Sequence, residues 1–200
     1  EAQAAALADD IAYNSHDMDD GLRAGLFEIA AVEEAVPFVA RIVAEVRSRY
    51  PDLETSRLIH ETTRRVITVL VEDAIAESVR RIDAIDPRSA DDVRAGTGQV
   101  VAFTEEMATA LRDLRGFLFA RMYRHHRINS VMANAEEVVE RLFSEFIARP
   151  SRMPAEWAHA CEATDQARRA RIVGDYIAGM TDRFALVEHR RLFDEAPELR

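Results

Sequence analysis

A stretch from Thr55 to Ile85 contains neither glycine nor proline and repeats apolar residues at helical spacing. Pro51 precedes it and Pro87 follows it, and proline interrupts helices because it lacks a backbone N–H. The spacing therefore predicts one long helix. Its middle, VITVLVEDAI, is apolar on most sides, which predicts a central place in the core. The residues expected to point inward are Ile59, Val66, Ile67, Leu70, Val71, Ile75, Val79 and Ile82.

The rest of the chain also favours helices, since it holds only seven glycines and six prolines in 200 residues. Helices are predicted at about 27–50 with an interruption near Pro37, from an N-cap at Thr104 toward Tyr123, and at about 130–148 and 165–193. No segment alternates apolar and polar residues strongly enough to propose a sheet. Residues 88–99 are predicted to form a mobile loop, and a short strand there is the alternative. The fold class predicted is all-α, a multi-helix bundle.

The two later helices are each predicted to pack along one apolar stripe. The expected inward residues are Met132, Ala135, Val139, Leu142, Phe143 and Phe146 in the first, and Val173, Ile177, Met180, Phe184 and Val187 in the second.

The segment from Ala8 to Gly25 is unusually acidic and divides into two faces when it is laid on a helix. Asp9, Tyr13 and Asp17 recur at every fourth position, so they form a row on the polar face. No Lys or Arg lies between Glu1 and Leu22 to balance these acids. The missing countercharge is a metal ion, a cationic side chain from elsewhere, or water. The opposite, packing face is expected to hold Leu7, Ile11, Asn14, Met18 and Leu22.

Three stretches, in order, resemble one family. They are EAQAAALADDIAYNSHDMDDGLRAGLF at the start, FLFARMYRHHRI at 117–128 and DYIAGMTDRFA at 175–185. They are similar to segments of the bacterial deoxyguanosinetriphosphate triphosphohydrolases and their dGTPase-like relatives, within the HD-domain phosphohydrolase superfamily. The resemblance implies a metal-dependent hydrolase that cleaves a deoxynucleoside triphosphate to a deoxynucleoside and triphosphate, with dGTP or other dNTPs as substrates.

The resemblance also assigns roles to the opening segment. Asp9 matches the last metal ligand of the family, and therefore a catalytic position, with Mg²⁺ or Mn²⁺ as the expected ion. Tyr13 and Asp17 match positions that face the sugar and phosphates of the nucleotide. The pair His16-Asp17 imitates the His-Asp motif of the superfamily without its upstream His partners, so it is not assigned as the metal pair.

Two further segments are candidates for substrate contact. Arg124 and Arg127 lie in a basic run, and arginine matches phosphate oxygens in charge and geometry. Cations near a helix C-terminus, or a contact with a neighbouring subunit, explain the same run without a ligand. The resemblance places Tyr176 near the sugar, while Gly174 and Gly179 also fit close helix packing.

Composition restricts partners and compartment. A net charge of −10 argues against general nucleic-acid affinity. The single cysteine, Cys161, cannot form an internal disulfide and is expected to be buried, and no apolar run is long enough for a membrane span. We expect a cytoplasmic protein with no membrane partner, and the resemblance adds a homo-oligomer.

The chain begins at Glu1 within an expected helix, which predicts a fragment whose remaining His and His-Asp ligands lie upstream. In that interpretation, residues 1–26 are the last helix of the HD catalytic core and residues 27–200 are the helical C-terminal region. The fragment alone is then expected to be inactive, and the upstream half of the polypeptide is its partner. The alternative is a non-catalytic, all-helical interaction or ligand-sensing module, in which Asp9, Tyr13 and Asp17 are replaceable.

Overall fold

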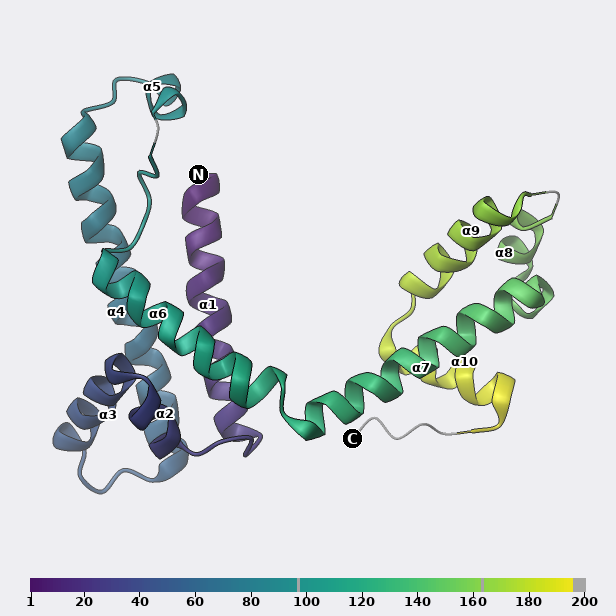
Figure 1. Ribbon diagram of the computed structural model, residues 1–200, viewed down its shortest axis with the longest axis horizontal. Helices are drawn as coiled ribbons and strands as arrows, with labels where there is room; N and C mark the ends of the chain where they lie inside the picture. The colour runs from purple at the N-terminus through teal and green to yellow at the C-terminus, as the bar shows by residue number, and fades with distance from the viewer. Residues whose placement is uncertain (97, 163, 196–200) are drawn as a thin grey trace. The chain divides into compact units, whose positions relative to one another are not determined.

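The computed structural model describes residues 1–96, 98–162 and 164–195 (Figure 1). Within these ranges every regular element is helical, which confirms the all-α prediction. The loop predicted at 88–99 contains a short helix, Ala90–Ala95, and no strand among its described residues; Thr97 lies outside them. The elements are α1 (Ala2–Arg23), α2 (Ile29–Ala35), α3 (Pro37–Arg49), α4 (Thr55–Ile85), α5 (Ala90–Ala95), α6 (Glu105–Leu118), the π-helix η1 (Phe119–Tyr123), α7 (His126–Ala148), the 3-10 helix η2 (Pro150–Arg152), α8 (Ala155–Ala160), α9 (Gln166–Ala178) and α10 (Asp182–Phe193).

The chain forms two compact units, Glu1–His125 and His126–Arg200. They are called unit 1 and unit 2 below. The division predicted at residue 26 depends on the expected resemblance to a longer protein and stays a prediction. Within unit 1, α1 packs along α4 and also contacts α6. None of the helices in the described ranges is long and apolar enough to cross a bilayer.

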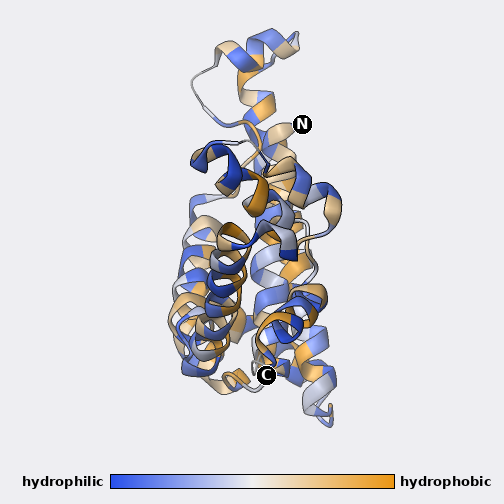
Figure 2. Cartoon of the chain, turned by 90° about the vertical axis from the view of Figure 1, so that its right-hand side faces the viewer, coloured by the Kyte–Doolittle hydropathy of each residue, from blue (hydrophilic) through white to orange (hydrophobic). Residues whose placement is uncertain are grey.

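The packing face predicted for α1 is confirmed. Ile11, Asn14, Met18 and Leu22 are buried, and Leu7 is partly buried against the same core. Gly21 is needed at this interface because a Cβ there would lie 2.4 Å from the ring of Phe27. That ring packs edge-on against Phe117 of α6, with centroids 4.9 Å apart. Figure 2 shows apolar and polar residues alternating along the helices, as amphipathic helices require.

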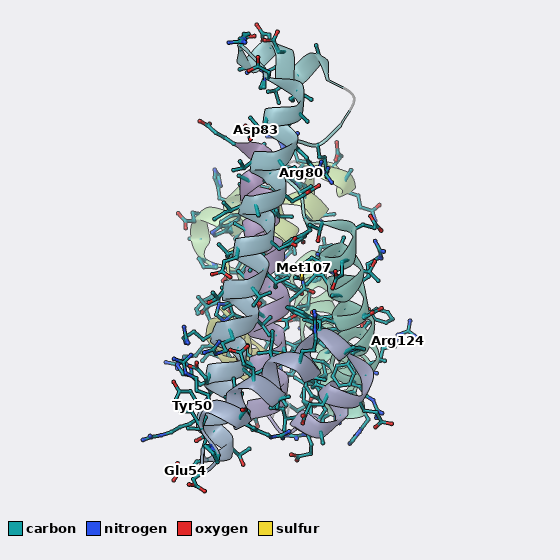
Figure 3. All side chains as sticks on the ribbon, turned by 90° about the vertical axis from the view of Figure 1, so that its left-hand side faces the viewer. Tyr50, Glu54, Arg80, Asp83, Met107 and Arg124 are labelled. Atoms are coloured by element: carbon teal, nitrogen blue, oxygen red, sulfur yellow. The ribbon has the colours of Figure 1, made fainter. Side chains whose placement is uncertain are left out.

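The long helix α4 has the predicted bounds but not the predicted burial. Ile59, Val66 and Leu70 are buried, and Ile67 is partly buried against the core. The expectation for the other four inward residues was wrong, since their side chains are exposed: Val71, Ile75, Val79 and Ile82. The helix carries two adjacent apolar stripes, and neighbouring elements cover only one of them. Figure 3 faces this outer side of α4, near the labelled Arg80 and Asp83.

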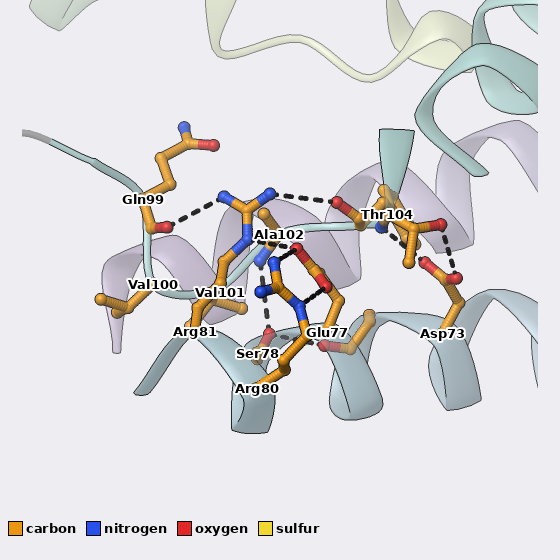
Figure 4. Close-up of polar contacts among 12 residues, drawn as sticks. Asp73, Glu77, Ser78, Arg80, Arg81, Gln99, Val100, Val101, Ala102 and Thr104 are labelled. Atoms are coloured by element: carbon orange, nitrogen blue, oxygen red, sulfur yellow. Dashed lines mark hydrogen bonds and ion pairs between the residues drawn. The ribbon is translucent and has the colours of Figure 1, made fainter. Parts of the chain in front are cut away.

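Side chains of α4 hold segment 99–104 against that helix (Figure 4). Asp73 accepts hydrogen bonds from the backbone N–H and the hydroxyl of Thr104, at 2.9 and 2.8 Å. Ser78 accepts one from Ala102 N–H, and Arg81 donates to the Gln99 carbonyl. Side chains therefore supply the backbone partners that a sheet would otherwise provide. From α1, the Gln3 side chain accepts from two further backbone N–H groups, those of Val100 and Val101.

The helix starts predicted at Thr104 and Asp165 are confirmed. Each side chain accepts a hydrogen bond from a backbone N–H of the first turn, Thr104 from Met107 and Asp165 from Arg168. The interruption near Pro37 is also confirmed, since α2 ends at Ala35 and α3 begins at Pro37.

Unit 2 is built from α7, α8, α9 and α10. The prediction of one helix from 165 to 193 was wrong: α9 ends before Gly179, and the Thr181 side chain caps the start of α10. Glycine weakens a helix interior and threonine favours an N-cap, so this short sequence favours a break.

The buried core of unit 2 contains the cysteine, as expected. Tyr176 lies in this core between Phe146 and Trp157, with ring centroids 5.4 and 5.3 Å away. The other buried members are Val138, Leu142, Met153, Cys161 and Val173.

The inward stripes predicted for unit 2 were partly wrong. Leu142, Phe146 and Val173 are buried, and Ile177 and Met180 pack against the core. The remaining large apolar members are exposed because each helix turns a neighbouring stripe toward the core, with Val138 buried on α7. The exposed residues are Met132, Val139 and Phe143 on α7, and Phe184 and Val187 on α10.

The buried Glu77 makes stability depend on pH. Its carboxylate pairs with Arg80 and Arg81 at 2.7 Å each, and the hydrogen bonds from these guanidinium groups lower the pKa of Glu77 from 4.5 to about 2. A lowered pKa stabilises the fold above pH 4.5, and this contribution disappears as the pH falls through the folded-state pKa.

Glu77→Gln should therefore destabilise the protein at neutral pH, and the difference from wild type should shrink as the pH falls from 4.5 toward 2. Urea unfolding followed by circular dichroism measures it. The control is Glu72→Gln, an exposed residue of the same helix with no ion pair in the described ranges, which should show little difference at any pH. A Glu77→Gln deficit that stays constant over this range would contradict the assignment.

Candidate functional site

The polar face of α1 projects away from the core, as the sequence predicts. Asp9 and Tyr13 are exposed and Asp17 is half-buried, so the three side chains form a row over two turns. Asp9 makes no hydrogen bond or ion pair with any described residue. Its carboxylate is therefore available to a ligand from outside this part of the chain.

Arg115 of α6 supplies one countercharge to this acidic helix. Its guanidinium lies 2.7 Å from the Asp10 carboxylate and donates to the side-chain carbonyl of Asn14 at 3.3 Å. Asn14 in turn donates to the Asp10 backbone carbonyl at 2.6 Å. These contacts fix the Arg115 guanidinium at the surface of α1 and leave some of its five N–H groups for another acceptor.

Asp17 is paired with a neutral hydrogen-bond donor, the side chain of Tyr123. Its hydroxyl donates to the Asp17 carboxylate across 106 residues of sequence. Burial, followed by the hydrogen bonds with Asp17 and Tyr13, raises the pKa of the Tyr123 hydroxyl well above its usual value, so the group stays protonated. Tyr123 ends the π-helical turn that follows α6, and such turns are frequent at functional sites.

A hollow of about 530 Å³ lies between these residues, entirely within unit 1. Its volume is in the range of small-molecule sites. One side carries the polar groups of α1 with Arg115, while Leu118 and two aromatic rings provide apolar surface. Such a site suits a ligand with a ring, hydroxyl groups and negative charge. The lining residues are Asp10, Tyr13, Asn14, Arg115, Gly116, Leu118, Phe119 and Tyr123.

The structure brings three of the predicted substrate residues to one side of unit 1. Tyr13 lines the hollow, Asp17 binds Tyr123, and the Arg124 guanidinium lies over the Phe119 ring, 4.6 Å from its centroid.

The other two predicted substrate residues belong to unit 2. Arg127 lies in the first turn of α7, and Tyr176 is 7% exposed within the core of that unit. Burial raises the pKa of the Tyr176 hydroxyl, a buried group with no hydrogen-bond partner in the described ranges. Their roles toward a nucleotide stay predictions.

The described residues fit one part of a metal site. A hard cation prefers carboxylate oxygen, and Asp9 offers one. In the described ranges, however, no three His, Cys, Asp or Glu side chains gather closely enough to hold an ion. Asp9 can act as one ligand, and the others would have to come from residues beyond these ranges.

Arg115, Phe119 and Tyr123 are parts of the site that the sequence did not predict. Phe119 and Tyr123 lie inside the FLFARMYRHHRI stretch, of which only basic residues were predicted as site residues. The sequence feature that could have indicated these two residues is their spacing, since aromatic residues four positions apart share one helix face. Arg115 gave no local signal, because its partners lie about 100 residues earlier.

Comparison with known proteins gives concordant matches. Residues 101–191 match a family described as a phosphohydrolase-associated domain. A deoxyguanosinetriphosphate triphosphohydrolase-like protein of Azorhizobium caulinodans is 53% identical over 200 residues, all of this chain and 50% of the relative. Proteins of the same name from Brucella anthropi and Parvibaculum lavamentivorans are each 50% identical, over 100% and 97% of this chain and 49% of each relative. The chain thus spans about half the length of these curated relatives.

The raised pKa of Tyr123 can be measured by alkaline titration of tyrosinate absorbance. Because Tyr123 stays protonated near pH 10, Tyr123→Phe should leave the absorbance that the folded protein develops there unchanged. In urea all four tyrosines are solvated, so the same variant should lose one quarter of the signal. Loss of the same fraction in the folded protein near pH 10 would contradict the partly buried Tyr123–Asp17 hydrogen bond.

Proposed function

Because the chain belongs to the family of deoxyguanosinetriphosphate triphosphohydrolase-like proteins, we propose that it is part of a metal-dependent dNTP triphosphohydrolase. The reaction would cleave dGTP or another dNTP to the deoxynucleoside and triphosphate. The observation that carries this proposal is the hollow between α1 and α6, which lies beside the row formed by Asp9, Tyr13 and Asp17.

Asp9 would hold a divalent cation, Mg²⁺ or Mn²⁺, together with ligands from outside the described residues. Such an ion supplies positive charge to the phosphoryl oxygens of a bound nucleotide. Asp9 is one turn from Tyr13, which lines the hollow, so a nucleotide bound there can bring its phosphates close to Asp9.

The other residues would bind and orient the nucleotide. Asp17 uses only part of its acceptor capacity on Tyr123, so its carboxylate can also accept a hydrogen bond from a sugar hydroxyl. The Tyr13 and Phe119 rings offer flat surfaces to a sugar or base. Arg115, held by Asp10 and Asn14, presents its remaining N–H groups to phosphate oxygens. Arg124 and Arg127 are further candidates for phosphate contact.

The described residues do not complete a metal site, and the chain spans about half of its relatives. We therefore propose that these 200 residues alone are inactive and that activity needs the polypeptide at the length of the relatives. The alternative is a non-catalytic helical module that binds a ligand in the same hollow. It requires neither a metal nor Asp9.

Asp9→Ala tests the enzyme proposal directly. In the longer polypeptide with Mg²⁺ or Mn²⁺, release of triphosphate from each dNTP should fall by more than about 100-fold, because changes that only surround a metal ligand already cost 10–100-fold. Asp20→Ala is the matched control, an exposed acid of the same helix that should retain wild-type activity. If the wild-type protein released no triphosphate from any dNTP with either metal, the non-catalytic alternative would be favoured.

Asp17→Asn tests the positioning role. The amide keeps the size of the side chain but loses a charged acceptor, and hydrogen bonds to charged groups contribute about 1.5–3 kcal/mol. We expect kcat/KM for the preferred dNTP to fall by about 10–100-fold, mainly through KM. Asp20→Asn should leave both constants unchanged. A KM equal to that of wild type would remove Asp17 from the binding site.

A further inference from the structure

The first turns of α1 make few contacts with the rest of unit 1. The buried residues of this helix begin at Ile11, and before it only Gln3, Leu7 and Asp10 are even partly buried. Leu7 packs at the edge of the core. The position of Asp9 within unit 1 therefore depends on a small number of side chains on either side of it.

Gln3 connects this end of α1 to segment 99–104. Its side-chain oxygen, Oε1, accepts hydrogen bonds from the backbone N–H groups of Val100 and Val101, at 3.0 and 3.1 Å. Among residues 1–9, all of which the structure describes, no other side chain makes a hydrogen bond to a described residue. One oxygen atom thus pairs two backbone donors that lie nearly 100 positions away in the sequence.

Segment 99–104 is itself fixed to α4. Asp73, Ser78 and Arg81 of that helix bond its backbone at both ends and in the middle (Figure 4). Arg81 also donates to the Phe103 carbonyl at 3.5 Å. Because α1 packs along α4, the contact of Gln3 joins the first turn of α1 to the same helix that supports its buried side.

We propose that Gln3 is a positioning residue for Asp9. The inference rests on the proposed function, since it takes Asp9 as a metal ligand. Gln3 precedes Asp9 by about 9 Å along the helix and lies about 120° around it. Gln3 therefore fixes this part of α1 from one side, while the Asp9 carboxylate stays open on another. Metal sites tolerate deviations of only about 0.2 Å in ligand distance, so a small movement of these turns weakens binding.

Binding of Mn²⁺ to the longer polypeptide, followed by electron paramagnetic resonance without nucleotide, tests this role. Gln3→Leu keeps a good helix former of similar size but removes the acceptor. We expect its Kd for Mn²⁺ to rise by about 10-fold or more, as for other residues that orient metal ligands. Gln3→Glu keeps an acceptor oxygen at the same place, so its Kd for Mn²⁺ should stay close to that of wild type.

Gln99→Leu is the matched control, because it makes the same change on segment 99–104. The Gln99 side chain is exposed and only its backbone carbonyl is bonded, so the Kd for Mn²⁺ should not change. A second readout is KM for the preferred dNTP at saturating Mn²⁺. Gln3→Leu should leave this KM close to that of wild type, because Gln3 does not line the hollow. Circular dichroism establishes that every variant is folded.

A Gln3→Leu variant that binds Mn²⁺ as tightly as wild type would overturn the positioning role. So would an equal weakening by Gln99→Leu, a Gln3→Glu variant that binds no better than Gln3→Leu, or a Gln3→Leu variant whose KM rises along with its Kd. A wild-type protein that binds no Mn²⁺ would instead overturn the metal-dependent function itself. That result is obtained before any residue is changed, so the two failures are distinguishable.

Discussion

Burial of one side of α1 against α4 is the constraint on which the rest of unit 1 depends. Met18 and Ser15 of α1 and Thr62 of α4 are fully buried at the heart of this unit. Because a helix is rigid, fixing one side also fixes the direction of the other. The packing of Ile11, Met18 and Leu22 therefore turns Asp9, Tyr13 and Asp17 outward.

The carboxylates on the polar face of α1 need hydrogen-bond or ion-pair partners, and these partners differ from one carboxylate to the next. Asp10 receives a cation from Arg115, and Asp17 receives a neutral donor from Tyr123. Asp9 receives neither from the described residues. The same helix therefore binds α6 and the following turn through Asp10 and Asp17, and leaves the Asp9 carboxylate for a cation from outside the described residues. The hollow lies where α6 changes into the π-helical turn, and Asp10 of α1 lines it together with Tyr13.

Local chemistry predicted most of the fold. The bounds of α4, the N-cap at Thr104, the helix start near Asp165 and the buried side of α1 depend on residues close in sequence, and all were predicted. Periodicity could not decide which of two apolar stripes on α4 is covered, since that depends on neighbouring elements. The Tyr123–Asp17 hydrogen bond joins residues 106 positions apart, and a single sequence contains no record of that contact. Of the candidate site, the row on α1 was predictable and its α6 wall was not.

We propose that packing of α1 leaves Asp9 free to bind a catalytic cation beside the hollow between α1 and α6. The most direct measurement is anomalous X-ray scattering from crystals of the longer polypeptide grown with Mn²⁺. We expect an anomalous peak within bonding distance of the Asp9 carboxylate, on the side of the helix that carries Tyr13. A manganese site elsewhere, with Asp9 exposed to water, would contradict it.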